Sequence, residues 1–158
     1  IAATFPNLGG AFPAARFCDE AGLEQAVRDG RVRALFCAAP HGAAAGRVDA
    51  LLGVAATAGV ELTVVDASAD FRFRDPAAYA RVYGHPHACP ERLAEFAAAV
   101  PEHVDGLPAK HVGHPGCFVT SVLLGIVPLL RAGLAEPEFF VSAVTGSTGA
   151  GHSRETAD

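Results

Sequence analysis

The chain has 158 residues, enough for one domain with a substantial hydrophobic core, and a formal net charge of -5. Lys and Arg number 12 against 17 Asp and Glu and form no basic cluster, which argues against a nucleic-acid partner. The longest apolar stretch, 117–130, is too short to cross a bilayer and contains a proline.

The four cysteines show neither CxxC nor zinc-site spacing, and a disulfide scaffold does not suit so large and apolar a chain. We therefore expect a reducing cytoplasmic environment and assign no metal. Five histidines have no regular ligand spacing and are expected at the surface: His85, His87, His103, His111 and His152.

Strand-like and helix-like segments alternate from the start, which predicts an α/β fold with a mostly parallel sheet. Asp19 is a suitable N-cap for a helix that Gly30 would end. The apolar run 32–38 predicts a buried strand, an alanine-rich helix follows over 43–58, and 60–67 predicts a second strand. Together the last three segments have the length of a right-handed βαβ unit.

After the second strand the chain becomes more polar. Residues 68–76, SADFRFRDP, form a predicted loop at the carboxyl end of that strand, which is the edge where ligands bind in open α/β sheets. Residues 76–83 predict a short helix, 85–90 are expected to be irregular, and 91–112 fit either helix or strand.

The last third of the chain predicts a long helix and a strand. The helix covers about 117–132 and ends at Gly133, with Pro128 expected to kink it or to remove one backbone hydrogen bond. A strand is predicted over 138–144, leading into the glycine-rich segment TGSTGAG at 145–151.

Cys117 follows Pro115 and Gly116 and opens the predicted long helix. Unpaired backbone N–H groups at a helix N-terminus favour a thiolate, lower the pKa of the thiol and can stabilise an oxyanion. Such a thiolate can attack an acyl phosphate or a carbonyl to form a covalent intermediate. The alternative is a small buried residue at a helix start. His114 can likewise tune the thiol or act as a base, or it can be a turn residue.

Two glycine-containing loops follow predicted strands. Pro40–Gly42 precedes a helix, whose start suits a phosphate, but an ordinary strand-to-helix turn explains it equally well. Thr145–Gly151 can cradle a phosphate or lie against a flat cofactor ring, or it can be a flexible turn.

The SADFR segment offers a hydroxyl, a carboxylate and a guanidinium within one loop, Ser68–Arg72. Arg72 can clamp a phosphate or a carboxylate. The alternative is a solvated loop in which Asp70 and Arg72 pair with each other or with Arg74 and Asp75.

Taken together, these segments resemble the N-acetyl-gamma-glutamyl-phosphate reductase family of arginine biosynthesis, including the related reductase of a carrier-bound aminoadipyl phosphate in lysine biosynthesis. The specific part is HPGCF followed by its helix, with SADFR upstream of it. The sequence segments that carry the resemblance are, in chain order, FPNLGG, APHG, DASADFRFRDP, HPGCFVTSVLLGIVPLLRAGL and TGSTGAG.

The resemblance implies a Rossmann-like NADP-binding domain over 1–116, lacking its first strand and glycine loop, and the truncated start of a mixed α/β catalytic domain over 117–158. The family's nucleophile falls on Cys117, and Arg72 falls in the substrate-binding lining. The cofactor-binding positions fall on Pro40, His41, Gly42, Ser68, Ser147, Thr148, Gly149, Ala150 and Gly151.

The implied reaction is the NADPH-dependent reduction of an acyl phosphate to a semialdehyde through a cysteine thioester, by a cytoplasmic homodimer or homotetramer. The sequence also departs from the family: no GxxGxxG motif precedes Phe5, and the family's catalytic histidine is expected beyond Asp158. Both ends look unfinished, so the chain by itself is expected to be inactive and to bind NADP poorly. An aspartate-semialdehyde type of oxidoreductase and a non-catalytic nucleotide-binding module remain as alternatives.

Overall fold

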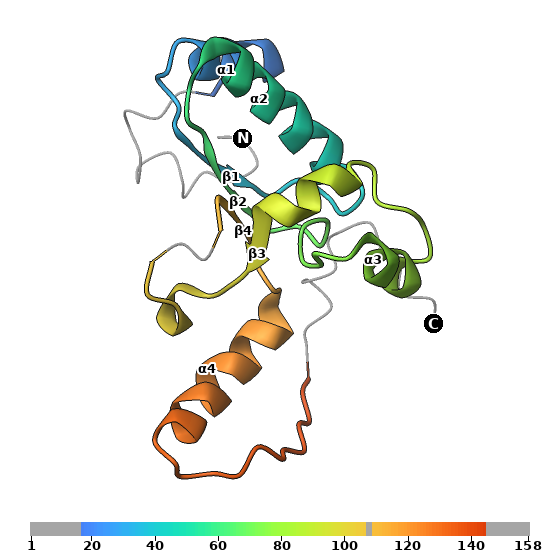
Figure 1. Cartoon of the computed structure of the whole chain (residues 1–158), viewed down its shortest axis with the longest axis vertical. Coiled ribbons are helices and arrows are strands. Elements are labelled where there is room, and N and C mark those ends of the chain that lie inside the picture. Colours follow the sequence, from blue (N-terminus) through green and yellow to red (C-terminus); the bar gives the residue numbers. More distant parts are fainter. Residues whose placement is uncertain (1–16, 107–108, 145–158) are drawn as a thin grey trace, which may run out of the picture.

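The computed structural model describes residues 17–106 and 109–144. Its α-helices and 3-10 helices alternate with short strands along the chain (Figure 1). The helical elements are α1 (Glu20–Arg28), α2 (Ala44–Ala58), α3 (Pro76–Tyr83), η2 (Pro90–Glu95), η3 (Pro101–His103) and α4 (Cys117–Arg131).

Within the described residues, the strands form one parallel sheet in the order β1-β2-β4-β3, which confirms the predicted α/β fold. The strands are β1 (Ala34–Cys37), β2 (Thr63–Asp66), β3 (Phe96–Ala98) and β4 (His111–Gly113). The succession β1, α2 and β2 is the predicted βαβ unit.

Capping residues set the helix boundaries where the sequence predicts them. The Asp19 carboxylate accepts a hydrogen bond from the Gly22 amide at 2.8 Å and so begins α1. Gly59 adopts a left-handed conformation at the end of α2, as the Gly30 and Gly133 backbones do after α1 and α4.

One face of the sheet carries the core, and residues 17–106 and 109–144 leave the other face largely uncovered. Helices α1 and α2 lie on the same side of the sheet in Figure 1, and residues of α2 and the strands make the buried cluster. On the opposite face, Phe36, Val65 and Val112 are register neighbours, and the Phe36 side chain is 80% exposed. Parallel sheets are normally covered on both faces, so this apolar row is an unusual surface.

The structure settles one ambiguous prediction of secondary structure and contradicts another. Residues 91–112, which fitted either helix or strand, contain η2, the short strands β3 and β4, and η3. The predicted strand at 138–144 is wrong, because this segment has no strand pairing and instead runs along α4. A β-rich local sequence becomes a strand only where a neighbour completes its hydrogen-bond ladder.

Helix α4 projects from the sheet as a separate arm (Figure 1). It has no buried residue, and it continues through Pro128 to Arg131. His103 of η3 anchors it, because its Nε2 lies 2.9 Å from the Leu123 carbonyl oxygen while its own carbonyl accepts from Arg131 at 2.9 Å. Across the described ranges, no helix has the length and apolar character needed to cross a membrane.

Candidate active site

The loops singled out in the sequence converge on one edge of the sheet. Pro40–Gly42 follows β1, Ser68 follows β2, and Cys117 follows β4 after a three-residue turn. Because these strands are parallel, their carboxyl ends share an edge, the usual ligand-binding edge of open α/β sheets. The predicted residues 147–151 lie outside the described part of the chain.

Cys117 is exposed and is the first residue of α4. Gly116 is the N-cap, with φ +98°, and no side chain caps the first turn of the helix. The backbone N–H groups of this turn are therefore available to an anion or a developing oxyanion next to the thiol.

His114 closes the turn that leads to Cys117. Its Nδ1 accepts from the Gly116 amide at 3.1 Å, its Nε2 lies 3.4 Å from the Thr120 hydroxyl, and its own amide donates to the Asp66 carbonyl at 2.7 Å. The two ring nitrogens thus have partners in the turn and at the start of α4. Of the two alternatives for this residue, the structure shows the turn role.

Arg72 is placed against the same turn. Its Nε donates to the His114 carbonyl at 3.0 Å, and a Cβ atom at Gly116 would lie 3.0 Å from the guanidinium carbon. The alternative of a solvated loop, in which Arg72 pairs with an acidic neighbour, is therefore wrong. The contact sets a fixed positive charge beside the uncapped end of α4, where a phosphate ester is attracted.

The same loop approaches β4 backbone to backbone. A Cβ atom at Gly113 would collide with the carbonyl oxygen of Phe71. Only glycine fits this position, because nothing but hydrogen separates the SADFR loop from the strand that leads to Cys117.

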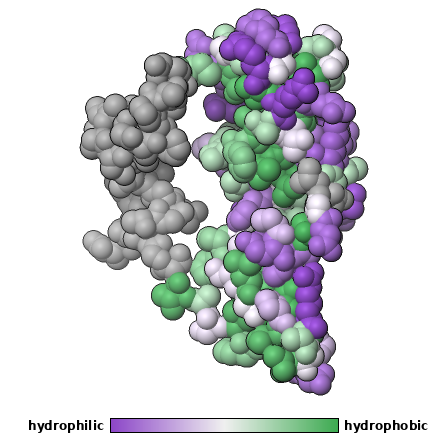
Figure 2. Space-filling view, turned by 90° about the vertical axis from the view of Figure 1, so that its left-hand side faces the viewer, coloured by the Kyte–Doolittle hydropathy of each residue, from purple (hydrophilic) through white to green (hydrophobic). Residues whose placement is uncertain are grey.

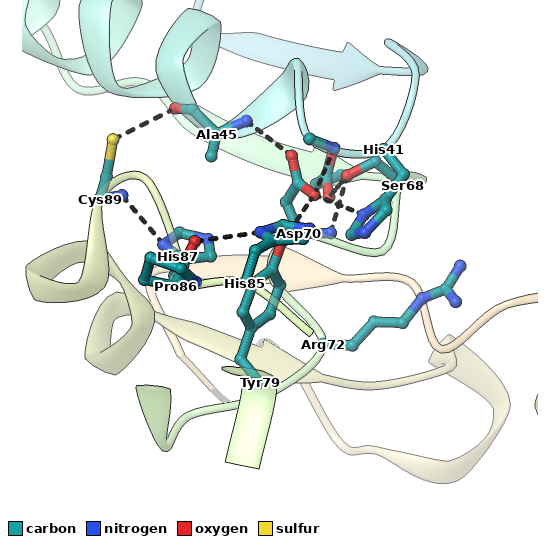
Figure 3. Close-up of polar contacts among 12 residues, drawn as sticks. His41, Ala45, Ser68, Asp70, Arg72, Tyr79, His85, Pro86, His87 and Cys89 are labelled. Carbon is teal, nitrogen blue, oxygen red and sulfur yellow. Dashed lines mark hydrogen bonds and ion pairs between the residues drawn. The ribbon is translucent and has the colours of Figure 1, made fainter. Parts of the chain in front are cut away.

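Asp70 is fully buried and holds the loop after β1 (Figure 3). Its Oδ1 accepts from the Gly42 amide at 2.8 Å and lies 2.7 Å from His41 Nδ1, while Oδ2 accepts from the Ala45 amide at 2.9 Å. The expected alternative of a solvent-exposed Asp70 is wrong for a physical reason. Ala43, the N-cap residue of α2, provides no capping side chain, so the Asp70 carboxylate caps the Ala45 amide from the neighbouring loop.

Ser68 is also buried, and its hydroxyl is committed to the same network. It donates to Asp66 Oδ2 at 2.6 Å and accepts from the Asp70 amide at 3.0 Å. Next to Asp66, burial raises the pKa of the Cys37 thiol, and the Asp66 charge raises it further. Cys37 therefore stays a neutral thiol at neutral pH.

Two tyrosine rings of α3 pack near the His41 ring. Its ring centroid lies 4.4 Å from that of Tyr83 and 6.1 Å from that of Tyr79. Burial, with a contribution from the Asp70 charge, raises the pKa of Tyr79 to about 12, so its hydroxyl stays protonated and can donate to Asp70. The sequence did not predict this cluster, although two tyrosines on one face of a short amphipathic helix were a usable signal.

Two of the histidines expected at the surface are buried. His87 accepts from the Cys89 amide at 3.0 Å and meets the Phe71 and Tyr79 rings edge-on. His111 accepts from the Val64 amide at 3.2 Å between two strands. Each ring satisfies a backbone amide that the ladder or turn leaves unpaired, which spacing along the chain does not reveal.

Among the described residues, one group could be considered for a metal ion. Asp49, Cys89 and Glu91 place one potential ligand atom each within 4.8 Å of one another. However, Asp49 already accepts from Arg92 at 2.8 Å, and burial raises the pKa of the Cys89 thiol, which disfavours the thiolate that a metal requires. We assign no metal to this group.

Comparison with known proteins places the chain among sequence relatives with a common name. Residues 117–158 match the family model described as semialdehyde dehydrogenase, dimerisation domain. The chain resembles N-acetyl-gamma-glutamyl-phosphate reductases along most of its length. The protein of that name from Nitrosospira multiformis is 38% identical over 160 residues, covering 98% of this chain and 43% of the relative.

Other bacterial proteins of the same name show the same relation. The one from Dehalococcoides mccartyi is 40% identical over 125 residues, or 78% of this chain and 35% of the relative. The one from Halorhodospira halophila is 42% identical over 130 residues, or 80% of this chain and 36% of the relative. The chain thus spans less than half the length of these relatives.

Proposed function

We propose that this chain supplies the nucleophile and one cofactor loop of an NADP-dependent reductase that converts N-acetyl-gamma-glutamyl phosphate to N-acetylglutamate semialdehyde in arginine biosynthesis. The observation that carries the proposal is the exposed Cys117 thiol at the uncapped start of α4, with Arg72 packed against the preceding Gly116. The names of the relatives support the choice of substrate.

The first step is a substitution at the acyl carbon. The Cys117 sulfur, as thiolate, forms a bond to this carbon, the carbon–oxygen bond to phosphate breaks, and inorganic phosphate leaves with the electron pair. Arg72 and the amides of α4 stabilise the negative charge on the phosphate and on the carbonyl oxygen. The product on the protein is a thioester, a good hydride acceptor.

The second step needs a reductant. The nicotinamide cofactor, held by the loop after β1, would supply it as a hydride to the thioester carbon. The resulting thiohemiacetal then loses the Cys117 thiolate and leaves the aldehyde, so one hydride reduces the acyl group and the thiolate is regenerated. The general base that handles the protons is not assigned to any described residue.

The loop residues fit a cofactor approaching this edge. Gly42 has φ +82°, and nothing lies within 4 Å of the position that a Cβ atom would take. We assign Pro40, His41, Gly42 and Ser68 to this part of the site, with Ser68 acting through the buried network. A second cofactor loop at residues 147–151 remains a prediction. The boundary between the cofactor-binding and catalytic domains at 116/117 also remains a prediction.

Alkylation tests the nucleophile directly, and the chain offers a matched control. Cys18 and Cys117 are both exposed, whereas Cys37 and Cys89 are buried. We expect iodoacetamide to modify Cys117 at neutral pH at least tenfold faster than Cys18, read by mass spectrometry of the peptides. Equal rates at the two exposed thiols would contradict an activated nucleophile.

In the full-length protein that carries this sequence, Cys117→Ser should abolish reduction of N-acetyl-gamma-glutamyl phosphate while NADPH binding is retained. Turnover by this variant would refute the role of Cys117.

Assaying the unmodified protein with a carrier-bound aminoadipyl phosphate as well decides between the arginine and the lysine pathway. Bound NADPH without turnover of either substrate would favour the non-catalytic module.

A further inference from the structure

A carboxylate from the protein itself, that of Asp70, occupies the N-terminus of α2. The Asp70 carboxylate accepts from the amides of Gly42 and Ala45, the groups with which a helix start usually binds phosphate. Asp70 is fully buried, so water does not screen its charge from the helix end. A phosphate at this position would meet a carboxylate in place of free amides.

His41 presents a hydrogen-bond acceptor next to this position. Its Nδ1 lies 2.7 Å from Asp70 Oδ1, and since the carboxylate is only an acceptor, Nδ1 carries the proton. In the neutral ring, Nε2 is then the acceptor. The side chain is 37% exposed and its ring packs at a tilt against Tyr83, so the nitrogen is oriented yet reachable.

We propose that the Pro40–Gly42 loop binds an uncharged hydrogen-bond donor of the nicotinamide cofactor, a ribose hydroxyl or the carboxamide, and that Asp70 excludes phosphate from this position. The proposal rests on the cofactor site of the proposed function. Asp70 acts as a positioning residue, because it fixes the loop backbone and the protonated nitrogen of His41 without contacting the ligand (Figure 3). The pyrophosphate of the dinucleotide lies elsewhere.

The exclusion of phosphate is tested on the chain itself, without any turnover. In the ¹⁵N-labelled protein, inorganic pyrophosphate at millimolar concentration should leave the Gly42 and Ala45 amide signals in place. In Asp70→Ala, which removes the carboxylate and frees both amides, the same titration should move both signals to saturation. Saturating shifts in the unmodified protein, or none in the variant, would overturn the exclusion.

The positioning role is tested in the full-length protein. Asp70→Asn should raise KM for NADPH about tenfold, the loss expected for one charge-assisted hydrogen bond, with a much smaller change in kcat. Asp19→Asn is the control, because Asp19 also caps a helix but belongs to α1. An equal rise in KM in both variants would show that Asp70 acts only as a helix cap and does not position the cofactor loop.

The acceptor is identified with a cofactor analogue. His41→Asn keeps a donor for Asp70 in the place of Nδ1 and deletes Nε2. If the donor is the carboxamide, the variant loses affinity for NADPH but not for reduced 3-acetylpyridine adenine dinucleotide phosphate, which has no amide N–H. An equal loss with both cofactors assigns the ribose hydroxyl. No loss with either cofactor refutes the acceptor role, while Cys117 alkylation and the pyrophosphate titration still report separately on the nucleophile and on Asp70.

Discussion

Buried polar side chains in this molecule take the place of backbone partners. Asp70 caps α2 from another loop, and His111 accepts from the Val64 amide inside the sheet. Each is nearly or fully buried and each satisfies an amide that would otherwise be unpaired at a cost of roughly 1–3 kcal/mol. These residues therefore fix the strand ends on which the candidate site is built.

His111 makes the stability of the protein depend on pH. Burial lowers its pKa below the ordinary value, because a charged ring would lose hydration, and its acceptor role at Nδ1 also requires the neutral form. The stabilising contribution is complete above the unfolded pKa near 6.5 and is lost as pH falls below it. We expect the free energy of unfolding to fall by up to about 1.4 kcal/mol per pH unit over the range just below about pH 6.5.

Urea unfolding across this pH range measures the effect. His111→Asn keeps an acceptor for the Val64 amide but cannot titrate, so its stability should be nearly flat over the range. His85→Asn, at an exposed histidine, is the control and should retain the slope. The same slope in His111→Asn as in the unmodified protein would show that another group is responsible.

At the scale of elements, one arginine ties the second half of the chain to α2. Arg92 of η2 donates to Asp49 of α2 and to Glu95, each at 2.8 Å, and its side chain is only 26% exposed. Hydrogen bonds to these carboxylates raise the pKa of Arg92, which keeps the pair ionised throughout the physiological range. The tie holds η2 in place directly before β3.

Removal of this arginine should therefore destabilise the protein. We expect Arg92→Met to lower the free energy of unfolding by about 1–2 kcal/mol, since two partly buried carboxylates lose their partner. Arg31→Met is matched to it, because Arg31 also pairs with an aspartate but is 65% exposed, and it should cost at most about 0.5 kcal/mol. Chemical denaturation measures both changes. Similar losses of unfolding free energy in the two variants would show that the Arg92 ion pairs are no more stabilising than an exposed pair.

The elements also show how far sequence reasoning reaches. Helices with their own caps, such as α1 with Asp19 and α3 with Asp75 before its proline, were predictable because the signal is local. The strand β3 is three residues long and exists only through its pairing with β4. The apolar segment 138–144 lacks such pairing, so its local preference predicted a strand that is not there.

The candidate site divides in the same way. The positions of Pro40–Gly42, Ser68 and Cys117 at strand ends follow from the alternation of strands and helices. The partners of Asp70 and Arg72 do not, because each reaches across at least 25 residues of chain to a backbone group. The missing cap at Ala43 was the one local sign that α2 needed a carboxylate from elsewhere.

At the scale of the whole molecule, most of the exposed large hydrophobic side chains among the described residues lie on α4 and the segment after it, and apolar surface is visible in the lower part of Figure 2. Phe118, Val119, Leu124 and Leu129 are each at least 40% exposed, and Phe140 is 97% exposed. An exposed apolar patch of this kind marks an interaction surface. Together with the matched description of a dimerisation domain, it supports the proposal that copies of the full-length protein associate through α4 as a dimer or tetramer.

A charge on this helix should disrupt the association. We expect Leu124→Glu to shift the full-length protein to a smaller species in light scattering coupled to gel filtration, since an unpaired carboxylate would be buried in the interface. Val82→Glu is matched to it, because Val82 is an exposed apolar residue on α3. An unchanged mass in Leu124→Glu would place the interface elsewhere.

The crossing of the Phe71 carbonyl over Gly113 leaves no adjustable spacer between the loop that bears Arg72 and the strand that leads to Cys117. Their separation is set by direct contact between the Phe71 carbonyl group and the Gly113 backbone. A mutation meant to widen the space between Arg72 and Cys117 must therefore act on the turn at 114–116 or on the arginine itself. A saturation library at position 113 should return glycine alone among its folded members.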